Sequence, residues 1–270
     1  MNAFINHFTF EFRTGIRNRA LLFVTYLFPL VFYVMMGLLM TAVNPTFRET
    51  LIPAMIVFAI LTGTLMSLPD PLVAARNAGI LRSYRINGVP AVSILLIPAL
   101  SAFLHITLLM IIVVVSAPSL FDAPLPVNWP AFVLVFILMT TACAGLGLLI
   151  GVISSSSQMT VILAQLVFLP SMILGGLMLP HNLLPEALAR FAMLLPTTHA
   201  MNAFRGLAYN LTADFDPLWS IVILLAGSAL AFGLSIYLFA WSSNSARQRK
   251  RASLALLVAL PYVAGMLFLS

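Results

Sequence analysis

The sequence predicts an all-α integral membrane protein with six core transmembrane helices. Of its 270 residues, 62% are hydrophobic and only 7% are charged, and that charge density is too low for a water-soluble surface. About 20 helical residues cross the hydrocarbon core of a bilayer, and six apolar runs have a suitable length. These runs are residues 21–43, 51–68, 91–117, 129–153, 159–179 and 218–241.

Before the first span, residues 1–20 have the pattern of an amphipathic helix. One stripe is apolar, with Arg13 and Arg17 on the opposite face. The stripe contains Phe4, Ile5, Phe8, Phe12 and Ile16. A helix of this kind lies in the membrane interface, although an ordinary basic anchor before a first span has similar residues.

Basic clusters predict the orientation. They precede the first span, separate the second from the third, and follow the sixth. Their members are Arg13, Arg17, Arg19, Arg76, Arg82, Arg85, Arg247, Arg249, Lys250 and Arg251. Even numbers of crossings place all of them on one side, which the positive-inside rule makes cytoplasmic. We therefore expect a cytoplasmic N-terminus. We also expect it to be retained, because the first apolar run is too long for a cleaved signal and no small-residue cleavage site follows it. No nucleic-acid partner is expected, because every cluster adjoins a span.

The loop of residues 70–90 is predicted to contain a short helix that ends at Gly88 and Pro90. Its apolar side chains share one face and its arginines another. The apolar face has Ile80, Leu81 and Tyr84, and the other has Arg82 and Arg85. Such a helix suits docking into a groove of a soluble partner; the alternative is a solvated basic loop.

A few polar or small residues lie at membrane depth. The polar ones are His105 and Thr107 in the third span and Gln158 and Gln165 in the fifth. They line a substrate path or form interhelical hydrogen bonds, because polar groups in hydrocarbon need partners. In the fourth span, the small-xxx-small pair of residues 147 and 151 permits close helix contact, inside the protomer or across a dimer.

Residues 180–210 follow the fifth span and are predicted to form two short helices. Pro185 and Glu186 suit the first turn of one, and the other begins near Thr197 or Thr198, after Pro196. Both are too short to cross and too apolar for water, so we expect them in the outer half of the bilayer. Arg205 is predicted to pair with a carboxylate, with Glu186 as the candidate, or to meet lipid head groups at the outer surface; the alternative is a snorkelling anchor.

The last apolar segment, residues 254–269, is shorter and contains Pro261 and Gly265. It crosses the bilayer, lies at its surface or turns back within it, and we favour crossing as a possible seventh span.

No catalytic motif is present: the chain lacks a phosphate-binding loop, HExxH and GxSxG. The single cysteine, Cys143, excludes a disulfide framework and a thiolate metal site, and we expect no metal. No acidic or basic residue lies in the middle of a span, whereas ion-coupled carriers usually need an intramembrane carboxylate or a broken-helix ion site. Energy for active transport would therefore come from another chain.

Three stretches together resemble the membrane subunits of type-2 ABC transporters. The first is Arg17-Asn18-Arg19 followed by Phe28-Pro29-Leu30. The second is the loop pattern of Gly79, Leu81, Arg82, Arg85 and Pro90, although that family usually has an acidic residue before the glycine, where this chain has Ala74, Ala75 and Asn77. The third is Gly176, Pro180, Pro185-Glu186, Pro196 and Arg205-Gly206. The resemblance covers roughly residues 1–241.

The resemblance implies a permease of an ATP-driven exporter. Residues 70–90 would couple to the ATPase through Gly79, Leu81, Arg82, Tyr84, Arg85 and Pro90. Residues 180–210 would be outer re-entrant helices, with gate residues Gly176, Pro180, Leu183, Pro185, Glu186, Pro196 and Arg205.

The implied complex has two ABC ATP-binding subunits, which bind ATP and Mg, and a second permease copy or sister permease. This chain itself would hold no cofactor. The implied substrate is amphipathic, lipid-like or drug-like, and the implied location is a bacterial plasma membrane. The alternatives from other classes are an ion-coupled carrier and a membrane-embedded enzyme or assembly factor.

Overall fold

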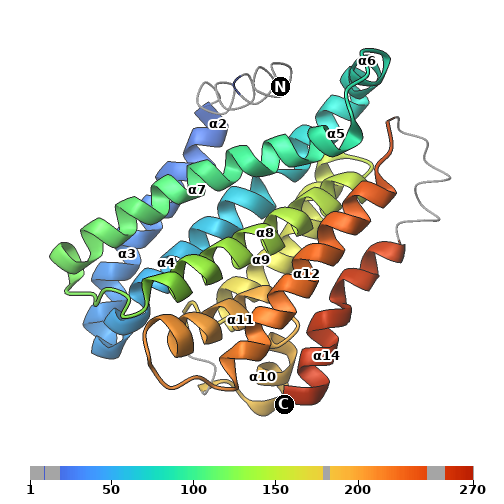
Figure 1. Ribbon diagram of the computed structural model, residues 1–270. Helices are drawn as coiled ribbons and strands as arrows, with labels where there is room; N and C mark the ends of the chain where they lie inside the picture. The colour runs from blue at the N-terminus through green and yellow to red at the C-terminus, as the bar shows by residue number, and fades with distance from the viewer. Residues whose placement is uncertain (1–8, 10–18, 179–182, 242–252, 270) are drawn as a thin grey trace.

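The computed structural model describes residues 9, 19–178, 183–241 and 253–269 (Figure 1). This part of the chain is helical and has no β-strand. Six of its helical stretches are long and apolar enough to cross a membrane, which confirms the predicted fold class. They are Phe23–Val43, Pro45–Asn77, Ala91–Phe121, Trp129–Ile153, Ser157–Leu174 and Pro217–Leu238.

The first long helix consists of α2 (Arg19–Leu22), the π-helical turn η1 (Phe23–Leu27) and α3 (Phe28–Val43). The wide turn lies directly before Pro29, where the N–H of Phe28 bonds to the carbonyl of Phe23, five residues back. Proline has no N–H for an ordinary helical bond, and a π-helical turn is one way to accommodate that loss. The predicted interfacial helix of residues 1–20 lies almost entirely outside the described residues.

The second long helix is the centre of the bundle. It comprises η2 (Pro45–Phe47), α4 (Arg48–Leu61), the π-helical η3 (Thr62–Met66) and α5 (Pro69–Asn77). In its most apolar stretch 89% of the residues are buried, compared with 22% in the fifth long helix, which is peripheral. The helix extends beyond the predicted residues 51–68, because Pro69 fits the first turn of α5. Asp70, where we expected a loop, is therefore helical.

Helix α7 (Ala91–Phe121) runs four residues past the predicted end, to a left-handed residue at Asp122, and α8 (Trp129–Ile153) has the predicted bounds. Helix α8 packs closely on the second long helix. A Cβ added to Gly147 would lie 2.8 Å from the carbonyl oxygen of Thr64, and one added to Gly151 would lie 3.0 Å from that of Pro69. The glycine pair thus packs inside the protomer.

The remaining long helices are α9 (Ser157–Leu174), five residues shorter at its end than predicted, and α12 (Pro217–Leu238). Between them lie α10 (Glu186–Ala192), α11 (Pro196–Ala203) and the π-helical η5 (Phe204–Ala208). Helix α12 contacts α8 on the side opposite the second long helix, where a Cβ on Gly145 would lie 2.8 Å from the Cβ of Ala231.

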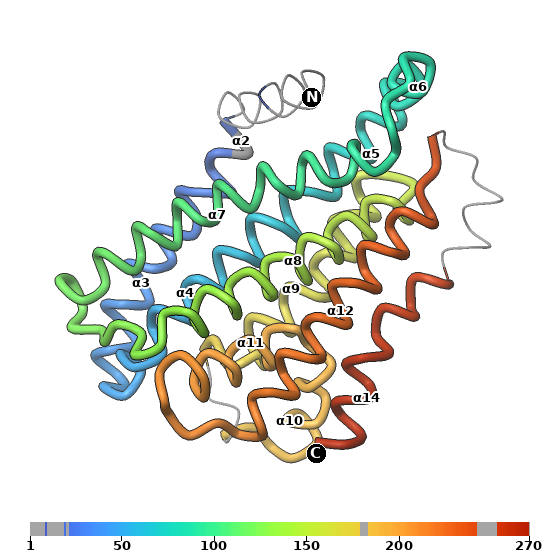
Figure 2. The backbone as a smooth tube through the Cα atoms, in the orientation of Figure 1, coloured from blue at the N-terminus to red at the C-terminus, as the bar shows by residue number. Residues whose placement is uncertain are grey.

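The apolar C-terminal segment folds as η6 (Ser253–Ala259) and α14 (Leu260–Leu269). Both pack along α12, and Figure 2 shows α14 running antiparallel to it. Tyr262 fills the space beside Gly227, and its ring centroid lies 5.9 Å from that of His199 in α11. Whether this segment crosses a bilayer stays a prediction.

Candidate functional site

Residues 70–90 form the end of the molecule farthest from α10 and α11 (Figure 1). Helix α6 (Ile80–Ile86) lies between two glycines with left-handed backbone, Gly79 at φ 77° and Gly88 at φ 72°. Other residues rarely adopt these angles, so the two glycines set where the helix starts and stops. Pro90 then caps the start of α7. The short helix predicted in this loop is confirmed.

The side chains of α6 differ from our expectation. Leu81 is only 1% exposed and packs into its own chain, and Tyr84 is half-buried. The prediction that Leu81 faces a partner is therefore wrong for this conformation, because the core covers it. Ile86, which we did not select, is 86% exposed, and Ile80 is exposed too. The side chains of Arg82 and Arg85 are exposed as predicted.

Arg76, at the end of α5, makes a contact that the sequence did not indicate. Its side chain is only 4% exposed. Its Nη1 donates to the carbonyl of Val152 at 2.9 Å, and its Nη2 donates to the carbonyl of Ser154. These carbonyls end α8, where the helix dipole is negative and favours a cation. Arg76 therefore joins the segment of residues 70–90 to one end of α8.

The other end of α8 is held by backbone bonds. The N–H groups of Val127 and Asn128 donate to the carbonyl of Ala208 in η5, at 2.9 and 3.0 Å. The Asn128 side chain also caps α8, and Phe132 in its first turn contacts Phe204, with ring centroids 5.3 Å apart. Helix α8 is thus bonded to residues 70–90 at one end and to the short helices at the other.

The two short helices predicted within residues 180–210 are present, and they differ in burial. Helix α11 starts at Pro196 and all its residues are buried, whereas α10 starts after Pro185 and is largely exposed. The Thr198 hydroxyl bonds to the carbonyl of Ala192, and His199 Nε2 lies 2.9 Å from the carbonyl oxygen of Met193, so α11 is anchored to the end of α10.

Of the remaining predicted gate residues, Gly176 has φ 83° and lies against Met201, and Leu183 is exposed. Pro180 lies outside the described residues.

Arg205 pairs with a carboxylate, as predicted, but the carboxylate is Asp214. The Nη1 to Oδ2 distance is 3.1 Å, and both side chains are 18% exposed. The predicted partner, Glu186, instead pairs with Arg190 one helical turn away, at 2.7 Å. The prediction failed because Asp214 reaches Arg205 through the fold of residues 209–216, whereas Glu186 has a local partner.

A hydrogen-bond network fixes Asp214. Asn202 is buried; its Oδ1 accepts from the N–H groups of Asp214 and Phe215, at 2.8 and 3.3 Å, and its Nδ2 donates to the carbonyl of Phe215 at 2.9 Å. The Asn202 Nδ2 also lies 3.2 Å from the hydroxyl oxygen of Ser220 in α12.

The candidate path residues are not gathered in one place. His105 Nδ1 lies 2.5 Å from the hydroxyl oxygen of Tyr26, which is an interhelical contact between α7 and η1. Thr107 bonds to its own helix, at the carbonyl of Phe103. Gln158 is exposed at the start of α9, and Gln165 is half-buried farther along it. His105 therefore makes an interhelical hydrogen bond, which was one of its two predicted roles. A role in a substrate path stays a prediction for all four residues.

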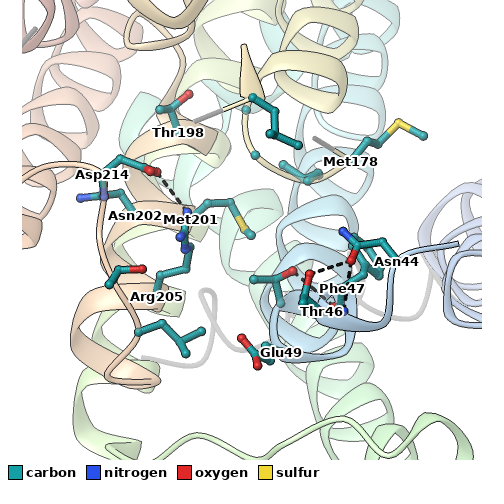
Figure 3. Close-up of a pocket in the computed structure, with 17 residues that line it drawn as sticks. Asn44, Thr46, Phe47, Glu49, Met178, Thr198, Met201, Asn202, Arg205 and Asp214 are labelled. Atoms are coloured by element: carbon teal, nitrogen blue, oxygen red, sulfur yellow. Dashed lines mark hydrogen bonds and ion pairs between the residues drawn. The ribbon is translucent and has the colours of Figure 1, made fainter. Parts of the chain in front are cut away.

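A cavity of about 310 Å³ lies at the α11 end, between η2 with the start of α4 and the segment from α11 to Asp214 (Figure 3). Its lining includes Glu49, Arg205, Asp214, Met178, Met201 and Thr212. Among the described residues, no three His, Cys, Asp or Glu side chains come together as a metal site.

A protein-family model described as ABC-2 type transporter matches residues 3–209. The match includes α6, α8 and the short helices and ends before α12. Comparisons with curated proteins and with solved structures gave no match.

Proposed function

The chain belongs to the ABC-2 type transporter family, and from this premise we propose that it is the membrane subunit of an ATP-driven exporter. Members of this family are transport subunits that normally work with an ATP-binding subunit. We assign binding of ATP and Mg, and ATP hydrolysis, to that partner. This chain supplies the translocation path.

The observation that carries the proposal is the attachment of α8 at both ends. Arg76 bonds it to the segment of residues 70–90, and the carbonyl of Ala208 bonds it to the short helices. Packed helices move as discrete bodies because a close-packed interior deforms little. A displacement of residues 70–90 by a partner would therefore pass through α8 to α11 and η5.

The distribution of charge supports an orientation. Arg76, Arg82 and Arg85 lie at the end that carries α6, with no charged residue in the middle of the spans. The positive-inside rule makes that end, and the N-terminus, cytoplasmic. Helices α10 and α11 then lie at the outer face of a bacterial plasma membrane, where we propose that they form the outer gate.

Helix α6 is the proposed docking element for the ATP-binding subunit. It offers two exposed aliphatic side chains, Ile80 and Ile86, beside the exposed Arg82 and Arg85. An apolar contact bordered by charges suits a groove on a soluble protein. The glycines at both ends of α6 set where this helix starts and stops. The complete exporter would contain two ATP-binding subunits and a second permease, identical or related.

Reconstitution tests the proposal. The tagged chain would be purified from native membranes with its ATP-binding subunit, and the complex placed in liposomes with a fluorescent short-chain phospholipid. We expect ATP-dependent movement of the probe by the complex and none by the chain alone. Movement by the chain alone, driven by an ion gradient, would contradict the proposal and favour the ion-coupled carrier.

A further inference from the structure

The cavity at the α11 end has charged and apolar walls. One wall contains the ion pair of Arg205 and Asp214, and Figure 3 shows Glu49 between this wall and the one formed by residues 44–47. Apolar side chains of Phe47 and Met201 also line it. Ligand pockets have volumes of roughly 300–1,000 Å³, so a cavity of about 310 Å³ holds a head group and the start of an apolar chain.

The charges of the lining do not balance. Among the described residues, its ionisable side chains are Glu49, Asp214 and Arg205, so two carboxylates against one guanidinium give this part of the lining a net charge of −1. Asp214 is paired with Arg205, and the cation next in sequence to Glu49, Arg48, lies 3.5 Å from Asp122. Of the carboxylates that the described part of the lining supplies, Glu49 is thus the one left to bind a ligand.

The wall is held in place before any ligand binds. Four hydrogen bonds of the buried Asn202 side chain fix residues 214, 215 and 220 around it. This network orients Asp214 toward Arg205, which keeps that carboxylate occupied. A preformed site loses less conformational entropy on binding than a flexible one.

We propose that this cavity binds the ammonium head group of an amphipathic ligand, with the cation at Glu49 and the apolar chain against Phe47, Met178 and Met201. A carboxylate gives an ammonium group charge-assisted hydrogen bonds, and thioether side chains adapt to varied apolar shapes. The further claim that this ligand is the exported substrate, bound before release outside, rests on the proposed function.

Binding to the purified chain, without ATP or partner, tests the site directly. The probes are octylammonium and dihexanoyl phosphatidylethanolamine, with octyl sulfate and dihexanoyl phosphatidylglycerol as anionic comparisons, measured by calorimetry in a maltoside detergent. We expect saturable binding of at least one amine probe and at least about tenfold weaker binding of both anions. Binding of octylammonium alone indicates a simple cationic amphiphile, and binding of the phospholipid alone indicates an aminophospholipid; both support the proposal.

Two variants and one control locate the binding. Glu49→Gln should weaken amine binding at least about tenfold, whereas Asp70→Asn removes an exposed carboxylate at the opposite end and should leave it unchanged. Thr212→Trp places a large ring in the cavity from an exposed position and should block every probe. Wild-type affinity in Glu49→Gln, or equal binding of anionic and amine probes, would overturn the proposal.

The two proposals fail separately. ATP-dependent transport by the complex without amine binding to the chain removes the cavity proposal and leaves the proposed function. Amine binding without ATP-dependent transport removes the proposed function and leaves the cavity proposal.

Discussion

Helix α8 is held at its two ends by different groups. At the α6 end, a single side chain, Arg76, bonds to the carbonyls of Val152 and Ser154. At the α11 end, the backbone N–H groups of Val127 and Asn128 bond to one carbonyl, and aromatic rings pack around them. The first attachment depends on one residue, while the second is spread over the backbone and several contacts. Substitutions should therefore disrupt the α6 end more easily than the α11 end.

The surroundings of the two ends also differ. Helix α6 projects from the bundle and exposes Ile86 and two arginines, whereas α11 is buried in every residue. Exposed apolar side chains on a helix need a partner to cover them, whereas those of a buried helix are already covered by the rest of the chain. This difference supports our proposal that the α6 end receives the partner and that the α11 end responds to it.

The largest effect is expected for Arg76→Gln, which removes the attachment at the α6 end. Carbonyls at the end of α8 lose a charged donor in a buried place, so we expect about 3 kcal/mol less stability. ATP hydrolysis by the complex should continue while transport falls at least about tenfold. Stability is measured by unfolding in mixed micelles and coupling by transport per ATP hydrolysed.

Arg190→Gln is the matched control, because it breaks an exposed ion pair and should change stability by less than about 0.5 kcal/mol. Arg76→Lys keeps the charge without the forked donors and should have an intermediate effect. Unchanged coupling in Arg76→Gln would refute the role of this attachment.

Gly147→Ala should have the second largest effect, because it separates α8 from the second long helix between the two ends. The added Cβ would lie 2.8 Å from a backbone oxygen that cannot move alone. We expect about 2 kcal/mol less stability. Gly233→Ala is the control, since a Cβ there meets no described atom within 4 Å apart from its chain neighbours and its own helix backbone. Equal unfolding curves for the two variants would show that α8 tolerates displacement.

Ile86→Asp should affect only the partner contact at the α6 end. Ile86 is exposed, so the fold should keep its stability, while binding of the ATP-binding subunit should weaken about tenfold. The measurement is the dissociation constant of the two purified subunits. Asn87→Asp adds the same charge at the next residue without removing an apolar side chain, and should weaken binding less. Similar losses in both variants would indicate a charge effect.

Arg205→Gln should have the smallest effect. The ion pair with Asp214 is partly exposed, so its loss costs about 1 kcal/mol. The backbone bonds to the carbonyl of Ala208 remain, and transport should fall less than in Arg76→Gln. A loss of transport greater than that of Arg76→Gln would reverse the proposed difference between the two ends.

Some of the candidate site was predictable from the sequence. Gly88 with Pro90, and prolines at 185 and 196, marked the two short-helix regions, because glycine permits and proline imposes particular backbone angles locally. The extension of the second helix through Asp70 was missed, since Pro69 and Pro71 have the composition of a loop as well as of a first helical turn.

Arg76 was missed for a different reason. Its sequence context is that of any basic residue beside a span, and its contacts come from α8, some 76 residues away. No local signal distinguishes an arginine that bonds to another helix from one in water. Leu81 was misassigned similarly, because helical periodicity identifies an apolar face but not what covers it.

Hydropathy, charge placement and helix-breaking residues are properties of neighbouring residues, and by themselves they determined the membrane class, the six long helices and the short helices between the fifth and sixth. The partners of polar groups depend on which distant segments the fold brings together. Tertiary structure alone therefore decided that Arg76 bonds to α8, that Arg205 pairs with Asp214, and that Glu49 faces a cavity at the α11 end.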